Sequence, residues 1–260
     1  MQKMRKNTMI DFKKAFKFAL ILLPIAIIGG IFTGFYLLDT YPEEILAEVI
    51  TELGSTGVLV VVSTVQTVGY ALFCGFFGYI LAESIGLWKP VRLQKKPLVM
   101  TLIVSVIGGL LFSLDYWTFG AVIDGIQSTN DVGLTAQGVI ASILYGGVIE
   151  EVMLRLFFMS LIAIILWKVF YKKYDKNHIP TAVFVLANVI AALLFAAGHL
   201  PATFAVFGGL TPMLVFRCFL MNGCFALVFG ELYRRYGIVY AMMSHAIFHI
   251  VSKLIWFIFV

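Results

Sequence analysis

Long apolar runs are the feature that most constrains how this chain can fold. Two of them, residues 18–38 and 98–114, contain no charged residue and approach the length of about 20 residues that a helix needs to cross a bilayer. Over the whole chain 61% of residues are hydrophobic and 13% are charged, against about 45–50% and about 25% in soluble domains. A water-soluble core cannot hold this excess of apolar side chains. We therefore predict that most of the chain lies in lipid.

Glycine, proline and charged residues divide the apolar sequence into seven predicted spans. These spans are residues 18–38, 57–82, 97–114, 137–167, 180–200, 211–231 and 238–259. The first run is longer than the core of a signal peptide and lacks a small-residue cleavage site, so we expect it to remain as a span. The predicted fold class is all-α, a polytopic transmembrane helix bundle.

Charged residues in the predicted loops alternate in sign along the chain. The basic groups are Lys3, Arg5, Lys6, Lys13, Lys14 and Lys17, then Lys89, Arg92, Lys95 and Lys96, then Lys168, Lys172, Lys173 and Lys176, and finally Arg234 and Arg235. The acidic groups between them are Asp39, Glu43, Glu44, Glu48 and Glu52, and then Asp115, Asp124 and Asp131. Because lysine and arginine are retained on the cytoplasmic side, we predict a cytoplasmic N-terminus and a C-terminus outside.

Other charge and cysteine patterns exclude some classes of protein. The net charge of +5 does not indicate a nucleic-acid partner, because the basic residues form short clusters between apolar runs instead of one stripe. The cysteines Cys74, Cys218 and Cys224 fall within apolar runs, so no disulfide framework is predicted. The acidic residues 42–53 form either a short amphipathic helix on the outer surface or a solvated loop, and such charge is more typical of a loop.

Few charged residues lie inside the predicted spans. Each one needs a structural or functional explanation, because placing a charged side chain in the membrane costs at least about 2.5–3.5 kcal/mol. Glu150, Glu151 and Arg155 lie together in the fourth span. On a helix Glu151 and Arg155 share a face, where the guanidinium can hold the carboxylate by two hydrogen bonds. Glu150 is turned about 100° away. One glutamate is then structural, and the other is available for chemistry.

Three histidines complete a candidate site. His199 stands before Pro201 at the predicted end of the fifth span, and His245 and His249 are four residues apart in the seventh. A glutamate shielded from solvent can act as a general base, and imidazoles can donate to an oxyanion or bind a metal. Counted from the basic loops at about 1.5 Å per residue, Glu150 and His199 lie nearer the outer side than His245. A tilted seventh span or shifted boundaries must close that gap.

Each of these elements also has a purely structural interpretation. Glu151 and Arg155 can form a salt bridge without chemistry, and a histidine at a helix end is often interfacial. His245 and His249 can hold helices together by hydrogen bonds. The combination of two carboxylates and three histidines on three apolar helices favours a site that activates water.

The three motifs in order resemble the CAAX protease and bacteriocin-processing family, also called Abi or type II CAAX endopeptidases. The family pattern is Glu-Glu-x-x-x-Arg, then Phe-x-x-x-His, then His-x-x-x-Asn. Glu150, Glu151 and Arg155 match the first motif, Phe195 and His199 the second, and His245 the third, with residues 230–237 resembling the lead into it. The resemblance covers about residues 137–255. Two departures stand out, because His249 replaces the usual Asn and Leu154 and Leu156 flank Arg155 where Phe and Gly are common.

The resemblance implies roles for these residues. Glu150 and His199 would position and deprotonate a water, His245 and the residue at 249 would stabilise the oxyanion, and Glu151 and Arg155 would brace the site. The alternative is a metalloprotease in which His199, His245, His249 or a glutamate hold Zn²⁺. Ala246 follows His245, so the usual His-Glu-x-x-His zinc motif is absent. We favour the glutamate-based scheme and keep a metal as the alternative.

The resemblance also implies an arrangement and a setting. We expect N-terminal transmembrane helices and loops at residues 1–136 and the protease core at 137–260, within one membrane domain. The expected location is a bacterial plasma membrane, and the expected partners are the lipid bilayer and a membrane-associated peptide or protein substrate. Two other functions stay open: a non-catalytic immunity or regulatory partner of the same fold, and a proton-coupled transporter. A transporter would be expected to show two similar halves, and the sequence has no such repeat.

Overall fold

A computed structural model describes residues 11–176 and 178–260, so the predicted basic residues Lys3, Arg5 and Lys6 lie outside the described part. In that part, seven helices or helical runs are long and apolar enough to cross a membrane, which confirms the predicted all-α, seven-span fold. The runs are Phe12–Thr40, Gly57–Ser84, Lys95–Ala121, Ala136–Phe170, Thr181–Phe207, Pro212–Tyr236 and Ile238–Phe259. Most are several residues longer than predicted.

Some runs are single helices and others are built from several. The first three are α1 (Phe12–Thr40), α3 (Gly57–Ser84) and α4 (Lys95–Ser113) with the short turns η1 (Leu114–Tyr116) and η2 (Phe119–Ala121). The fourth joins α6 (Ala136–Ala141), η3 (Ser142–Glu150), η4 (Val152–Met159) and α7 (Ser160–Phe170). The last three comprise α8 (Thr181–Gly198) with α9 (Leu200–Phe207), α10 (Pro212–Cys218) with η5 (Phe219–Gly223) and α11 (Cys224–Tyr236), and α12 (Ile238–Phe259).

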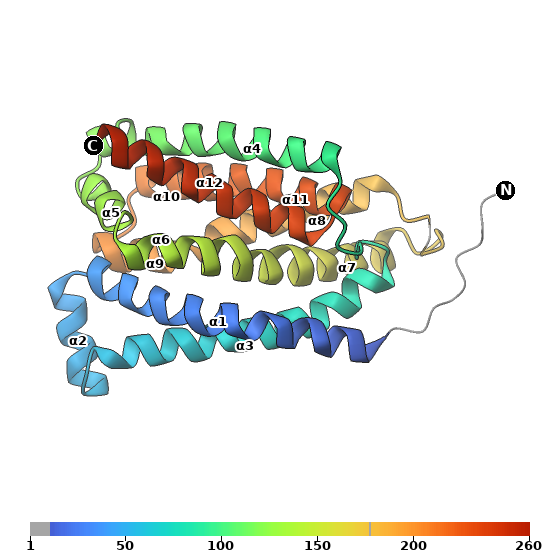
Figure 1. Ribbon diagram of the computed structural model, residues 1–260, viewed down its shortest axis with the longest axis horizontal. Helices are drawn as coiled ribbons and strands as arrows, with labels where there is room; N and C mark the ends of the chain where they lie inside the picture. The colour runs from blue at the N-terminus through green and yellow to red at the C-terminus, as the bar shows by residue number, and fades with distance from the viewer. Residues whose placement is uncertain (1–10, 177) are drawn as a thin grey trace.

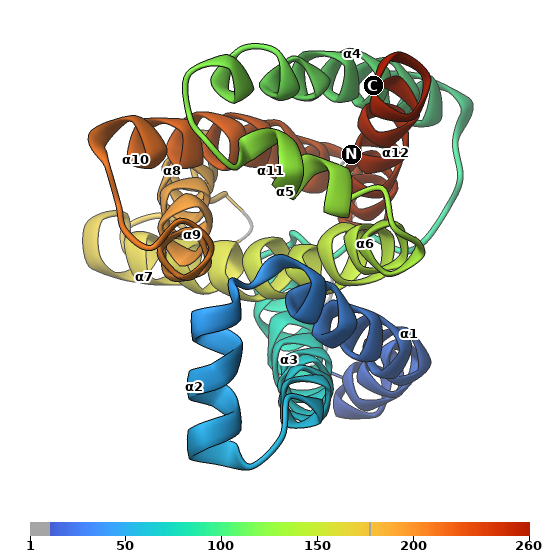
Figure 2. The same cartoon turned by 90° about the vertical axis from the view of Figure 1, so that its left-hand side faces the viewer.

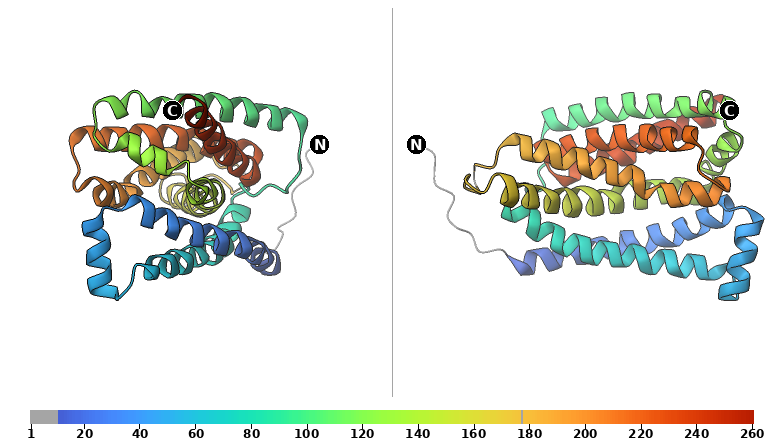
Figure 3. Two further views of the ribbon diagram at one scale, coloured as in Figure 1. Left: turned by 60° about the vertical axis from the view of Figure 1, so that its left-hand side comes forward. Right: turned by 180° about the vertical axis from the view of Figure 1, so that it is seen from behind.

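The fourth run lies at the centre of the bundle (Figures 1 and 2). On one side it contacts the pair α1 and α3, which pack along each other. On the other side it contacts α8 and α12, and α4 covers the outer face of α12 (Figure 3). A side chain on the central run can therefore face residues from both sides, which is where the site is found.

Small residues allow the helices to approach closely. A Cβ at Gly147 would lie 2.8 Å from Cβ of Ala246, and one at Gly30 would lie 2.6 Å from Cα of Thr64. Close approach through small residues is a common way to pack helices in membranes, where lipid supplies no hydrophobic driving force. The contact at Gly147 brings α12 against the central run beside Glu151.

Glu151 lies between two π-helical segments, η3 and η4. The π-helix, with hydrogen bonds between residues five apart, is rare and is frequently found at functional sites. It places residues five apart on one face, so Tyr145 lies one turn from Glu150. The regular 3.6-residue helix assumed from the sequence does not describe this segment.

The fifth run does not end at Pro201 as predicted. Helix α9 begins at Leu200 with Pro201 in its first turn, where the missing N–H is not needed. The helical run therefore continues to Phe207 and ends at Gly208, whose φ of 68° is left-handed. His199 thus lies inside the run, at the junction where α8 ends and α9 begins.

At the end of the bundle opposite Asp11, the structure differs from the sequence prediction in two further places. Residues 43–53 form a helix, α2 (Glu43–Leu53), which crosses the ends of α1 and α3 (Figure 1), so the favoured loop interpretation was wrong. Asp115, predicted as a loop residue, is buried and accepts hydrogen bonds from Arg217 at 2.7 and 2.6 Å and from Asn130 at 3.0 Å. The short helix α5 (Ile126–Val132), which carries Asn130, is thereby tied to α10.

Candidate active site

Glu151 forms the buried centre of the site. Its Oε2 lies 3.2 Å from Nε of Arg155, and its Oε1 accepts a hydrogen bond from Nδ1 of His245 at 2.9 Å. The side chain of Glu151 is completely inaccessible to solvent. A carboxylate in this position needs both partners, because an unpaired buried charge is strongly unfavourable. Glu151 therefore links the central run to α12.

Arg155 completes this connection through its other groups. Its Nη2 donates to the carbonyl of Ala226 at 3.1 Å, and its guanidinium lies over the rings of Phe195 and Phe229, 5.1 and 5.9 Å from their centroids. The predicted ion pair with Glu151 is present, but as one Nε contact and not as the two hydrogen bonds that the sequence suggested. Arg155 thus joins η4, α8 and α11 around the glutamate.

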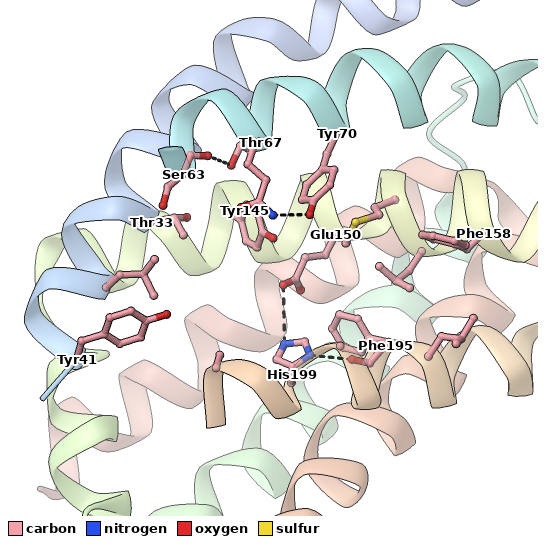
Figure 4. A pocket seen from close by; sticks show the side chains of 17 residues that line it. Thr33, Tyr41, Ser63, Thr67, Tyr70, Tyr145, Glu150, Phe158, Phe195 and His199 are labelled. Carbon is pink, nitrogen blue, oxygen red and sulfur yellow. Dashed lines mark hydrogen bonds and ion pairs between the residues drawn. The ribbon is translucent and has the colours of Figure 1, made fainter. Parts of the chain in front are cut away.

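Glu150 faces the opposite way, towards His199 (Figure 4). Oε1 of Glu150 lies 3.9 Å from Nε2 of His199, and the two side chains remain 12% and 35% exposed. The adjacent glutamates thus have different surroundings, since one is sealed among charged partners and the other can meet water and a substrate. The sequence predicted that the two side chains point in different directions, and the structure agrees with this orientation.

The contacts of His199 define which of its nitrogens carries the proton. Nδ1 lies 2.8 Å from the carbonyl oxygen of Phe195, which can only accept a hydrogen bond. Nδ1 is therefore the donor, and in the neutral ring Nε2 is left as an acceptor. Both atoms that face each other across the 3.9 Å gap, Nε2 of His199 and Oε1 of Glu150, are then acceptors. A water molecule can donate one hydrogen to each.

His245 and His249 form a stacked pair on α12. Their rings are 4.9 Å apart, and their Nε2 atoms are separated by 3.1 Å. The opposite face of His245 stacks on Phe229 at 4.5 Å. Because Nδ1 of His245 is held by Glu151, the ring is fixed with Nε2 directed at His249.

The described residues do not form the zinc site that the sequence left as an alternative. Among them, no group of three or more His, Cys, Asp or Glu side chains is arranged to hold a metal ion. His199 contacts Phe195 and Glu150, whereas the Nε2 atoms of His245 and His249 contact each other. A zinc site built on the three histidines does not fit this arrangement, and we derive no step through a metal.

Two cavities meet at Glu150 and His199. The larger, of about 540 Å³, lies between α1 and α3 on one side and α8 on the other (Figure 4). The smaller, of about 310 Å³, contains His245 and His249 with a group of aromatic rings. Tyr145 and Thr33 line both cavities together with Glu150 and His199. Glu150 and His199 therefore lie where the two cavities adjoin.

Several lining residues were not identified from the sequence. Tyr145 joins the site through the π-helical turn, and the helical period read from the sequence does not predict such a turn. The larger cavity is also lined by Ser63, Gln66, Thr67 and Tyr70 of α3. The sequence contains a pattern that could have identified them, because these polar side chains recur on one face of an otherwise apolar span.

The fold and the site together define a class: an integral membrane helix bundle with a glutamate and histidine centre enclosed among its spans. Residues 132–251 match the family model described as type II CAAX prenyl endopeptidase Rce1-like. This match agrees with the resemblance predicted from the motifs and makes this part of the chain similar to type II CAAX prenyl endopeptidases. Neither curated proteins nor solved structures gave a significant match.

Proposed function

We propose that the protein is an intramembrane endopeptidase that hydrolyses peptide bonds of membrane-associated proteins or peptides. The family match supports protease activity. The observation that carries the proposal is the pair of facing acceptors, Oε1 of Glu150 and Nε2 of His199, at the junction of two cavities. From the resemblance to bacteriocin-processing proteins, our expected location is a bacterial plasma membrane.

In the proposed reaction, one water donates its hydrogens to Glu150 and His199. Its oxygen attacks the carbonyl carbon of the scissile bond while Glu150 accepts the proton. The carbonyl oxygen becomes an oxyanion, which accepts a hydrogen bond from Nε2–H of His249, since Nδ1 of His245 already donates to Glu151 and leaves its Nε2 without a hydrogen. As the carbon–nitrogen bond breaks, the proton held by Glu150 passes to the leaving amine. Water is thereby divided between the two products.

Glu151 and Arg155 support this reaction without touching the substrate. Glu151 holds His245 through Nδ1, and Arg155 neutralises Glu151. Orientation of a catalytic histidine by a second group is a common requirement of such sites. These two residues are therefore positioning residues in the proposal.

The central test is the Glu150→Gln variant, which keeps the shape of the side chain but removes the base. We expect peptide cleavage by purified protein to fall by about 10²–10⁴-fold, with unchanged thermal unfolding. Glu48→Gln in α2 makes the same change outside both cavities and should keep full activity. A Glu150→Gln protein that cleaves normally would exclude the proposed base. If it retains the cellular phenotype that deletion abolishes, the protein acts as a non-catalytic partner.

A further inference from the structure

The larger cavity has a polar wall that the proposed reaction does not use. We propose that this wall, defined as Thr33 of α1 with Ser63, Gln66, Thr67 and Tyr70 of α3, binds the extended backbone of the substrate on one side of the scissile bond. The wall lies outside residues 132–251, the part that matches the family model. The inference rests on the proposed function and names the form in which the substrate is bound.

Hydrogen-bonding capacity is the first argument. The hydroxyl of Thr33 is buried and has no hydrogen-bond partner within the described part of the chain, although it lines both cavities. The hydroxyl of Tyr70 accepts a hydrogen bond from Gln66 at 2.6 Å, so its own hydrogen is free for a ligand. Thr67 donates to the carbonyl of Ser63 at 2.6 Å and keeps lone pairs that can accept. The wall therefore presents both donors and acceptors.

The membrane setting makes this wall informative. Lipid offers no hydrogen-bond partner to a backbone amide, so an unfolded peptide in a span needs partners from the protein. A hydrocarbon tail would need none. Polar side chains at positions 63, 66, 67 and 70 recur at helical spacing on the face of α3 towards the cavity. In Figure 4 Tyr70 lies near Glu150, and Ser63 and Thr67 lie further along the same helix, near Thr33 and Tyr145. The wall thus suits a peptide better than a lipid chain.

The dimensions agree with an extended segment. From Ser63 to Tyr70 the helix rises by about 10 Å, at about 1.5 Å per residue. An extended peptide covers the same distance with about three residues. Because both cavities include Glu150 and His199, a chain that follows the wall continues past the reactive pair.

The smaller cavity defines the other half of the substrate. Beyond the reactive pair it is lined by the apolar side chains Phe112, Met221, Phe225, Phe229 and Phe248. These groups suit a large apolar side chain next to the scissile bond. We therefore expect selection for an apolar residue on this side, and recognition mainly through the backbone on the side of the polar wall.

The test uses the full-length protein in detergent and a library of quenched fluorescent decapeptides. For the best peptide, Ser63→Ala, Thr67→Val and Tyr70→Phe should each raise KM about 2–10-fold, the effect of one lost hydrogen bond. kcat should change less than about twofold, because the lost hydrogen bond stabilises the bound substrate and the transition state equally. For Thr67, whose hydroxyl keeps lone pairs that accept, replacing the matching backbone N–H of the peptide by an ester oxygen should produce the same rise in wild type and no further rise in Thr67→Val.

Thr64→Val is the matched control. The hydroxyl of Thr64 donates to the carbonyl of Val60 at 2.7 Å, as Thr67 does to Ser63, but Thr64 lines neither cavity. It should leave KM unchanged. Equal KM values for wild type and all three wall variants would overturn the inference while leaving proteolysis intact.

A binding measurement separates this inference from the proposed function. Fluorescence anisotropy with Glu150→Gln protein should show peptide binding that Thr67→Val weakens by the same factor. If wild type cleaves no peptide but this binding is present, the reaction fails and the peptide site stands. If no peptide binds, or if Thr67→Val leaves the peptide affinity unchanged, the polar wall is not a peptide site.

Discussion

At the scale of single residues, the two adjacent glutamates lie in two different environments. Glu151 is enclosed by Arg155 and His245, whereas Glu150 remains partly open beside His199. Neighbouring positions on a helix point in different directions, so one residue of separation is enough. The sequence motif could identify both glutamates but could not supply the partner on α12.

Arg155→Ala should strongly destabilise the protein. It would leave Glu151 without its cation in a site closed to solvent, at an expected cost of about 3–5 kcal/mol in the free energy of unfolding. Thermal unfolding and yield in detergent would measure the loss. Arg235→Ala is the control, because this arginine forms an exposed ion pair with Glu231 and should contribute about 0–1 kcal/mol. Normal stability of Arg155→Ala would show that the buried pair is not required.

His249→Asn restores the residue usual in the family and separates two roles for this position. If His249 only donates a hydrogen bond, the variant should keep cleavage within about tenfold of wild type, since asparagine is also a donor. A chelator should then have no effect on either protein. Loss of bound zinc and of activity together, with zinc restoring the wild-type protein after chelation, would instead establish the metal alternative.

At the scale of helices, the site depends on close approach between elements that are far apart in sequence. The π-helical turns around Glu151 lie against α12 at Gly147 and Ala246. This contact sets the distance between Glu151 and His245. The two segments are separated by about a hundred residues of chain, so no local pattern in either predicts it.

Gly147→Ala should therefore impair both stability and activity. The added methyl would lie 2.8 Å from Cβ and 2.9 Å from Cα of Ala246, so the backbone of α12 must shift. Overpacking of this kind costs about 1–3 kcal/mol. We expect a lower unfolding temperature and reduced cleavage. Gly69→Ala, whose methyl would meet nothing within 4 Å, is the control and should be neutral or gain about 0.5–1 kcal/mol.

At the scale of the whole molecule, the seven spans place loops alternately at the two ends of the bundle. The end that carries Lys96 and Lys176 is basic, and the end with α2 is acidic. Orientation in the membrane is still a prediction from this bias.

Reporter fusions would test the orientation directly. Fusions after Lys96 and Lys176 should report the cytoplasm, and fusions near Glu48 and Asp124 should report the outside. The loop charges are the physical reason, because lysine and arginine resist translocation. The reverse pattern at both pairs of fusions would show that the orientation in the membrane is opposite to the predicted one and that α2 lies on the cytoplasmic surface.

The sequence by itself determined the class of fold, the approximate spans and the residues of the three motifs. These are local properties, because the apolar length needed to cross a bilayer and the cost of burying a charge act on each segment separately. Only the tertiary structure decided which residues meet. It placed His199 opposite Glu150, and it brought His245 to Glu151 across the contact at Gly147. It also turned the polar face of α3 towards the reactive pair, because packing between distant segments depends on all of their side chains at once.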